Sequence, residues 1–90
     1  MPILIPPATR TISELKAGAV ATVHSLAGGH DFCSRLANLG FTAGATVEVR
    51  QNWGHGPVLV ALRGTLVALG RSEAARVFVI PEPTDDADRA

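Results

Sequence analysis

The sequence predicts a mainly β domain, a small SH3-like barrel of about five strands with one inserted α-helix. Three observations predict it. The 90 residues are enough for one domain only. Short β-branched segments follow one another closely, with turn residues between them. A single segment has helical periodicity. Closing the strands into a barrel removes exposed sheet edges. The near alternative is a five-stranded oligonucleotide-binding barrel, although the aromatic stacking face of such domains is missing.

The five predicted strands are bounded by glycine, proline and asparagine. They lie near residues 19–26, 46–51, 58–63, 66–69 and 76–80. The second alternates apolar and polar residues, as expected for a strand with one wet face. Gly64-Thr65 suits a tight two-residue turn between the third and fourth strands. We expect five aliphatic residues of the second and third strands in the core: Val47, Val49, Val58, Val60 and Leu62.

The predicted helix spans residues 31–39. Asp31 can cap its first turn. Three apolar residues recur at i, i+4 and i+7 and form a stripe that we expect to be buried: Phe32, Leu36 and Leu39. Gly40 stands where a left-handed residue ends a helix, and Phe41 then falls where it can pack back on Leu36.

The two ends of the chain differ from its middle. Residues 1–10 are predicted to be a loosely held arm, residues 11–81 the folded domain, and residues 82–90 a disordered acidic tail. Thr11-Ile12-Ser13-Glu14 has the spacing of a capping box at the domain's start. No segment resembles a signal peptide or reaches the ~20 apolar residues of a membrane span. We therefore expect a soluble, cytoplasmic protein without direct membrane insertion.

Composition argues against several functional classes. Eight basic residues balance eight acidic ones, so no net field attracts nucleic acid. A single cysteine, Cys33, excludes an internal disulfide and fits a reducing compartment. No catalytic triad can be assembled from the scattered histidines. Gly54-His55-Gly56 has neither the length nor the lysine of a phosphate loop. These observations favour a protein that is not an enzyme and requires no cofactor.

A divalent metal site is a competing hypothesis. His30, Asp31 and Cys33 fall within four residues, and His55 lies in a glycine-flanked loop. Imidazole and thiolate suit Zn²⁺, while Fe²⁺ also accepts a carboxylate. The spacing of these residues matches no standard zinc finger. A metal site is therefore most plausible in a homodimer, where two chains each contribute ligands. The other interpretation makes Asp31 a helix cap, Cys33 a small buried residue and the two histidines surface turn residues. His24 is interpreted as structural or exposed.

Partner contact is the other function that single residues suggest. Trp53 lies in a loop rich in glycine, asparagine and proline, where it is either a plug of the barrel or an exposed hot spot. In the second case we expect the partner surface to comprise this loop, Asn52 to Pro57, together with the helix end at Leu39 to Gly44. Arg63 and Arg71 either are solvated or pair with acidic groups of a partner.

Three segments resemble the FeoA family. They are Ile12-Ser13-Glu14-Leu15-Lys16-Ala17-Gly18, the run from Leu36 to Gly44 with its Leu39-Gly40-Phe41, and the run from Leu62 to Ala75 with its Arg63-Gly64 and Ala68-Leu69-Gly70-Arg71. The resemblance covers residues 11 to 80. It implies a free-standing cytoplasmic SH3-like barrel that works beside FeoB, a membrane transporter for ferrous iron with a G-protein domain. The same barrel is also the C-terminal domain of metal-dependent repressors of the DtxR type. Those repressors carry a helix-turn-helix, which is absent from this sequence.

The expected function is therefore that of a non-enzymatic accessory protein that docks on a FeoB-type transporter and modulates it. The alternative is a domain whose dimerisation or partner contact depends on zinc or ferrous iron.

Overall fold

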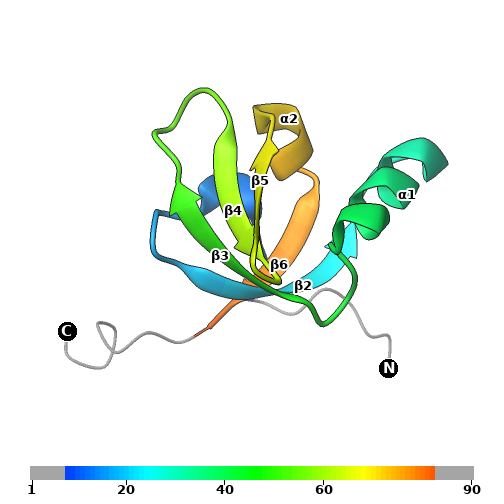
Figure 1. Ribbon diagram of the computed structural model, residues 1–90, viewed down its shortest axis with the longest axis horizontal. Coiled ribbons are helices and arrows are strands. Elements are labelled where there is room, and N and C mark those ends of the chain that lie inside the picture. The colour runs from blue at the N-terminus through cyan, green and yellow to red at the C-terminus, as the bar shows by residue number, and fades with distance from the viewer. Residues whose placement is uncertain (1–7, 83–90) are drawn as a thin grey trace.

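A computed structural model describes residues 8–82 of the chain. Its six strands form one antiparallel sheet in the order β1-β6-β2-β3-β4-β5 (Figure 1). In chain order the elements are β1 (Arg10–Thr11), the 3-10 helix η1 (Ile12–Glu14), β2 (Val20–Leu26), α1 (His30–Leu39), β3 (Thr46–Gln51), β4 (Val58–Leu62), β5 (Thr65–Leu69), α2 (Arg71–Ala74) and β6 (Val77–Pro81). The predicted class, mainly β with one inserted helix, is confirmed, and the sheet curls into the barrel shape.

The core is mainly aliphatic, with Phe32 and Phe41 as its aromatic members, and lies inside the curl of the sheet. All five residues predicted for it from the middle strands are at most 2% exposed: Val47, Val49, Val58, Val60 and Leu62. They alternate with more exposed residues along β3 and β4, so only one face of each strand is buried. Phe41, Ile12 and Leu36 are the largest of the fully buried side chains.

Six strands form where about five were predicted. The additional strand, β1, pairs Arg10 with Val79 and Thr11 with Phe78 of β6. Arg10 therefore belongs to the sheet and not to the predicted arm. At the other end of the domain, the Glu82 N–H donates to the Val20 carbonyl at 2.8 Å, so the sheet reaches one residue into the predicted tail. Residues 1–7 and 83–90 of the predicted arm and tail lie outside the described residues.

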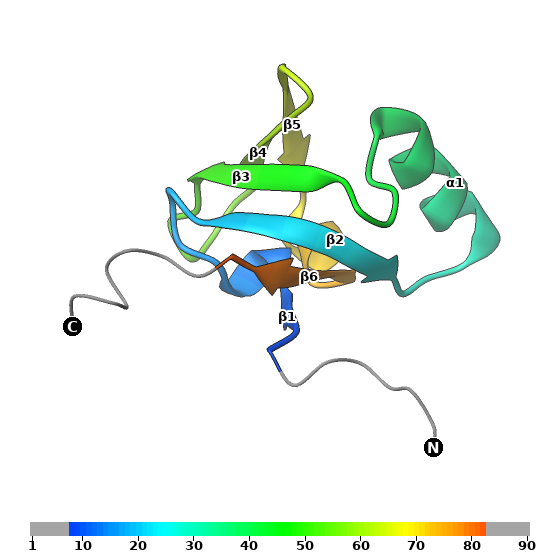
Figure 2. The ribbon, with the colours of Figure 1, turned by 90° about the horizontal axis from the view of Figure 1, so that it is seen from below.

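Helix α1 stands at one end of the sheet, beyond the end of β2 (Figures 1 and 2). Its N-cap is Gly29, and Asp31 lies in its first turn, so the prediction that Asp31 caps the helix is wrong. Gly28 is required just before it, because a Cβ there would lie 2.5 Å from the Phe32 ring. The guanidinium of Arg76 covers that ring at 4.2 Å from its centroid.

The end of α1 has the predicted Schellman geometry. Gly40 has a φ of 111°, and the Phe41 N–H donates to the Leu36 carbonyl at 3.0 Å. Leu39, in contrast, is 45% exposed, so its prediction as a core residue is wrong. The helix buries Phe32 and Leu36 and packs the half-buried Cys33 beside them, because it stands at the end of the sheet and not across its core face.

The hairpin between β4 and β5 turns one residue earlier than predicted. Leu62 pairs with Thr65, so the two-residue turn is Arg63-Gly64. Both turn residues have positive φ, 53° and 79°, as a type I′ turn requires. The shift removes Arg63 from the predicted strand and places it at the hairpin tip.

Two smaller predictions concern local contacts. The Thr11 N–H donates to the Glu14 carboxylate at 3.1 Å, which is one half of the predicted capping box. The Thr11 hydroxyl lies 2.8 Å from the Ser13 hydroxyl. His24 is half-buried on β2 and its Nδ1 lies 3.1 Å from the Ser25 hydroxyl. Among residues 8–82, no helix has the length and hydropathy needed to cross a membrane.

Candidate partner-binding surface

The four residues considered as metal ligands belong to two separate elements. His30, Asp31 and Cys33 lie in the first turns of α1, and His55 lies in the loop between β3 and β4. Cys33 is a free, half-buried thiol whose Sγ lies 3.6 Å from the Gly28 carbonyl. Within residues 8–82, no three His, Cys, Asp or Glu side chains are grouped so that they could hold a metal ion.

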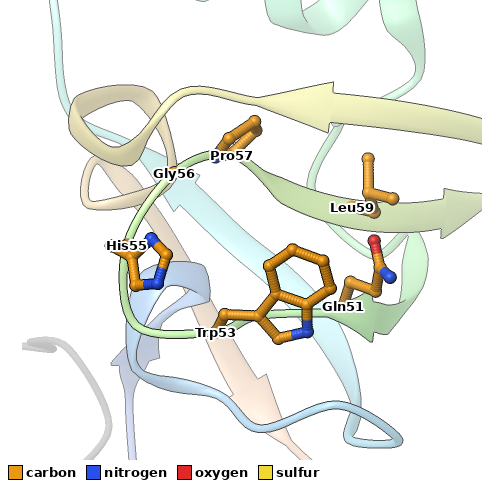
Figure 3. A pocket seen from close by; sticks show the side chains of 6 residues that line it. All are labelled: Gln51, Trp53, His55, Gly56, Pro57 and Leu59. Atoms are coloured by element: carbon orange, nitrogen blue, oxygen red, sulfur yellow. The ribbon is translucent and has the colours of Figure 1, made fainter.

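Trp53 is the most exposed large apolar side chain of the described chain. It is 71% exposed, which excludes it as a plug of the barrel core. It borders a hollow of about 310 Å³ lined by Gln51, Trp53, His55, Gly56, Pro57 and Leu59 (Figure 3). In Figure 3 the indole lies between His55 on the loop side and Gln51 and Leu59 on the strand side. None of these residues is Asp, Glu, Lys or Arg, and the exposed surface is largely apolar.

The loop that carries Trp53 is held by Asn52. The Asn52 Nδ2 donates to the carbonyls of Ser13 at 3.0 Å and Leu15 at 2.6 Å, both in the η1 region. Its Oδ1 accepts from the Gly54 N–H at 3.1 Å, which closes an Asx turn directly around Trp53. Gly54 and Gly56 have φ values of 87° and 71°, which side chains rarely adopt, so the glycines allow this path.

Arg71 of α2 completes the same network. Its guanidinium donates to the carbonyl of Gly56 at 3.0 Å, to the carbonyl of Ser13 at 3.1 Å and to the Asn52 Oδ1 at 3.0 Å. The side chain thus connects three separate parts of the chain. Its bonds are to its own domain, an arrangement that neither sequence interpretation of Arg71 included. The network therefore holds the loop in place within the domain.

Asn52 is the residue that the sequence did not single out. An asparagine next to Trp-Gly indicates only a turn. Its bonds to η1 span 39 and 37 positions of sequence. No local pattern indicates contacts of that range, so only the fold reveals them.

Charged side chains lie outside the hollow, among them Arg63 at the other end of β4 and Glu73 on α2. Arg63 stands exposed at the hairpin tip, and within residues 8–82 its side chain has no hydrogen bond or salt bridge. Glu73 of α2 forms a salt bridge with Arg35 of α1. The Gly70 N–H, at 2.9 Å, and the Arg35 guanidinium hold the pKa of Glu73 below its ordinary value.

The family model for the FeoA domain matches residues 10–81, nearly all of the described chain. A comparison with curated proteins found no match. Among solved structures, an iron uptake regulatory protein (FeoA) is 31% identical, with 82% of this chain and 99% of that chain covered and a TM-score of 0.78. The FeoA protein of Chlorobium tepidum is 35% identical over 78% of this chain and 68% of that one, with a TM-score of 0.72.

A third similar structure is the FeoA of Stenotrophomonas maltophilia in complex with zinc. It is described as a prokaryotic SH3 domain protein and a candidate ferrous iron transport activating factor. It is 35% identical, with 80% of this chain and 94% of that chain covered and a TM-score of 0.70. A manganese-dependent transcriptional repressor at 21% identity shares the fold alone, with a TM-score of 0.77 and 45% of its length covered. The domain match and the SH3-like barrel agree, and the chain belongs to the FeoA family.

Proposed function

We propose that this chain is a non-enzymatic, cytoplasmic accessory protein of ferrous iron uptake that docks on a FeoB-type transporter and modulates it. Its membership of the FeoA family supports the connection to iron uptake. The description of the Stenotrophomonas relative as a candidate activating factor supports a modulating role. The observation that carries the docking proposal is the exposed Trp53 on a loop held in place by Asn52 and Arg71.

A fixed loop with an exposed indole suits protein recognition. Tryptophan is enriched among the residues that dominate binding energy. Ordering a loop during binding costs free energy, so this cost is smaller for a loop that side-chain hydrogen bonds already hold in place. Because no Asp, Glu, Lys or Arg lines the hollow, contact there is mainly apolar and weakly dependent on salt. Arg63 stands outside the hollow, where a charge affects the association rate more than the affinity.

The test is the affinity of the purified chain for its cognate FeoB-type transporter in nanodiscs. Trp53→Ala is expected to weaken binding by about 2 kcal/mol or more, roughly 30-fold. Leu39→Ala tests the helix end separately, since Leu39 is also a large exposed apolar residue but lies on α1. Circular dichroism must show both variants folded. Equal losses for the two variants, or no loss for either, would contradict the proposed surface.

A second candidate function is metal-dependent association of two chains. The zinc complex of the Stenotrophomonas relative favours it. His30, Asp31 and His55 are exposed in this chain, and each could contribute a ligand to a site shared between copies, with Cys33 close by. Zinc titration in the analytical ultracentrifuge would then shift the wild type towards a dimer. Cys33→Ser and His55→Ala should weaken the shift, and His24→Ala should not. Equal shifts in all three variants would place the metal elsewhere.

A further inference from the structure

Strand β5 is the last strand of the sheet, and one of its edges is open. Among residues 8–82 it pairs only with β4. Leu62 and Thr65 face each other across the two-residue turn, so Thr65, Val67 and Leu69 exchange hydrogen bonds with β4. The N–H and C=O groups of Leu66 and Ala68 therefore point away from β4. No turn or loop bond of the described backbone uses them.

This edge lacks the devices that usually protect a terminal strand. The sequence Thr-Leu-Val-Ala-Leu contains no charge and no proline. The β4–β5 ladder continues without a bulge, whereas the β2–β6 and β3–β4 ladders each contain a register shift. Leu66 is 57% exposed. Natural sheets commonly blunt such edges, because free backbone groups beside apolar side chains attract another strand.

The side chains beside this edge form an apolar strip on the outer face of the sheet. Leu66 pairs with Ala61 and Ala68 pairs with Leu59. Because alternate residues share a face, these four side chains lie on the side opposite the buried Val60 and Leu69. Leu59 also lines the Trp53 hollow. The free edge and the hollow are thus joined by one continuous outer surface.

We propose that β5 receives an extended segment of the partner as a seventh strand of the sheet. This deepens the proposed function and rests on it, since the segment belongs to the transporter's cytoplasmic part. The open N–H and C=O groups of Leu66 and Ala68 supply main-chain hydrogen bonds to the segment. Its alternate side chains are apolar and cover the strip towards Trp53.

Charge specifies one end of the segment. From Arg63 to Ser72 the chain contains two arginines and no acidic residue, and the next carboxylate, Glu73, is already bound to Arg35. Arg63 has no acidic partner within residues 8–82. A segment with a carboxylate at the end that meets the hairpin tip would complement it.

A second copy of this chain fits the edge less well. An antiparallel β5–β5 pair centred on Val67 would bring the hairpin tip of each copy, with Arg63, towards the start of α2 of the other, with Arg71. Opposed like charges destabilise such a pair. A contact between two five-residue strands also buries far less surface than the area of about 1,200 Å² or more that stable dimers bury.

Amide hydrogen exchange tests the proposal residue by residue. The labelled chain is exchanged alone and in complex with the transporter in nanodiscs, then released and read by NMR. Alone, the Leu66 and Ala68 amides should exchange fast and the Val67 and Leu69 amides slowly. In the complex, Leu66 and Ala68 should slow by about tenfold or more, as newly bonded amides do. Binding that leaves these two amides fast overturns the strand addition and leaves the proposed function standing. No binding at all overturns both.

Two variants provide an independent readout. Ala68→Pro removes one edge donor, a change that edge strands tolerate, and Leu66→Lys places a charge beside the edge. Each should weaken transporter binding about tenfold. Thr46→Lys is the control, because Thr46 is exposed on β3, a strand with neighbours on both sides. Unchanged affinity in both folded edge variants overturns the proposal. The proposal is also overturned if the Leu66 and Ala68 amides of the chain alone become protected as its concentration rises. That result would mean that a second copy of the chain pairs with the edge of β5.

Discussion

Asn52→Ala should destabilise the domain and loosen the loop that carries Trp53. The change removes two bonds from Nδ2 to the η1 region and two bonds accepted by Oδ1, one of them from the Arg71 guanidinium. Net contributions of about 0.5–1.5 kcal/mol for each of the three neutral bonds, and of about 1.5–3 kcal/mol for the charged one, sum to roughly 3–7.5 kcal/mol. Asn52 is half-buried, so water can replace some of these bonds. We therefore expect a loss of about 2–3 kcal/mol, a large share of the roughly 5–10 kcal/mol of a small domain.

Urea unfolding followed by circular dichroism measures the loss. The fluorescence anisotropy of Trp53, the chain's single tryptophan, reports the loop separately in the folded state. Gln51→Ala is the control, because Gln51 is an adjacent exposed polar residue that has no side-chain hydrogen bond within residues 8–82. A loss below about 0.5 kcal/mol, within the usual range of surface changes, together with unchanged anisotropy, would refute the role given to this network.

Three further predictions concern the domain as a whole. Leu36→Ala should cost about 2–5 kcal/mol by urea unfolding, because Leu36 is fully buried in the core; a cost under 1 kcal/mol would mean that the helix is not packed as described. Because folding lowers the pKa of Glu73, its ionised carboxylate stabilises the folded domain. That stabilisation is fully present above the ordinary carboxyl pKa and is lost as the pH falls through the pKa of the folded state. Glu73→Gln should therefore reduce stability at neutral pH by about 1 kcal/mol or less, as expected for a partly exposed pair, and the difference should shrink on acidification; a difference that grows in acid would reverse the sign argued here. The purified chain should hydrolyse neither GTP nor ATP, and turnover that survives a second purification step would contradict its assignment as a non-enzyme.

Elements defined by local chemistry were predictable from sequence. The end of α1 depends on Gly40 and on the spacing of Phe41 and Leu36, all within six residues, and the structure has this geometry. The alternation along β3 and β4 also identified the buried valines correctly. Both signals are periodic or positional, so they do not depend on the rest of the fold.

Features that depend on the position of other elements were not predictable in this way. The apolar stripe of α1 could not show that the helix stands at the end of the sheet, where Leu39 remains exposed. Gly64 fits either position of a two-residue turn, and only the pairing of Leu62 with Thr65 fixes the register. Likewise, the exposure of Trp53 and the bonds of Arg71 follow from how the loop, η1 and α2 meet.

The most direct measurement of the proposed docking is fluorine NMR of the chain labelled with fluorotryptophan at Trp53, its single tryptophan. The indole is 71% exposed in the free chain, so burial against a partner changes its surroundings strongly. Addition of the FeoB-type transporter in nanodiscs should shift or broaden the resonance, and empty nanodiscs should leave it unchanged. An unchanged fluorine resonance under conditions where sedimentation shows the complex to be formed would contradict docking through Trp53.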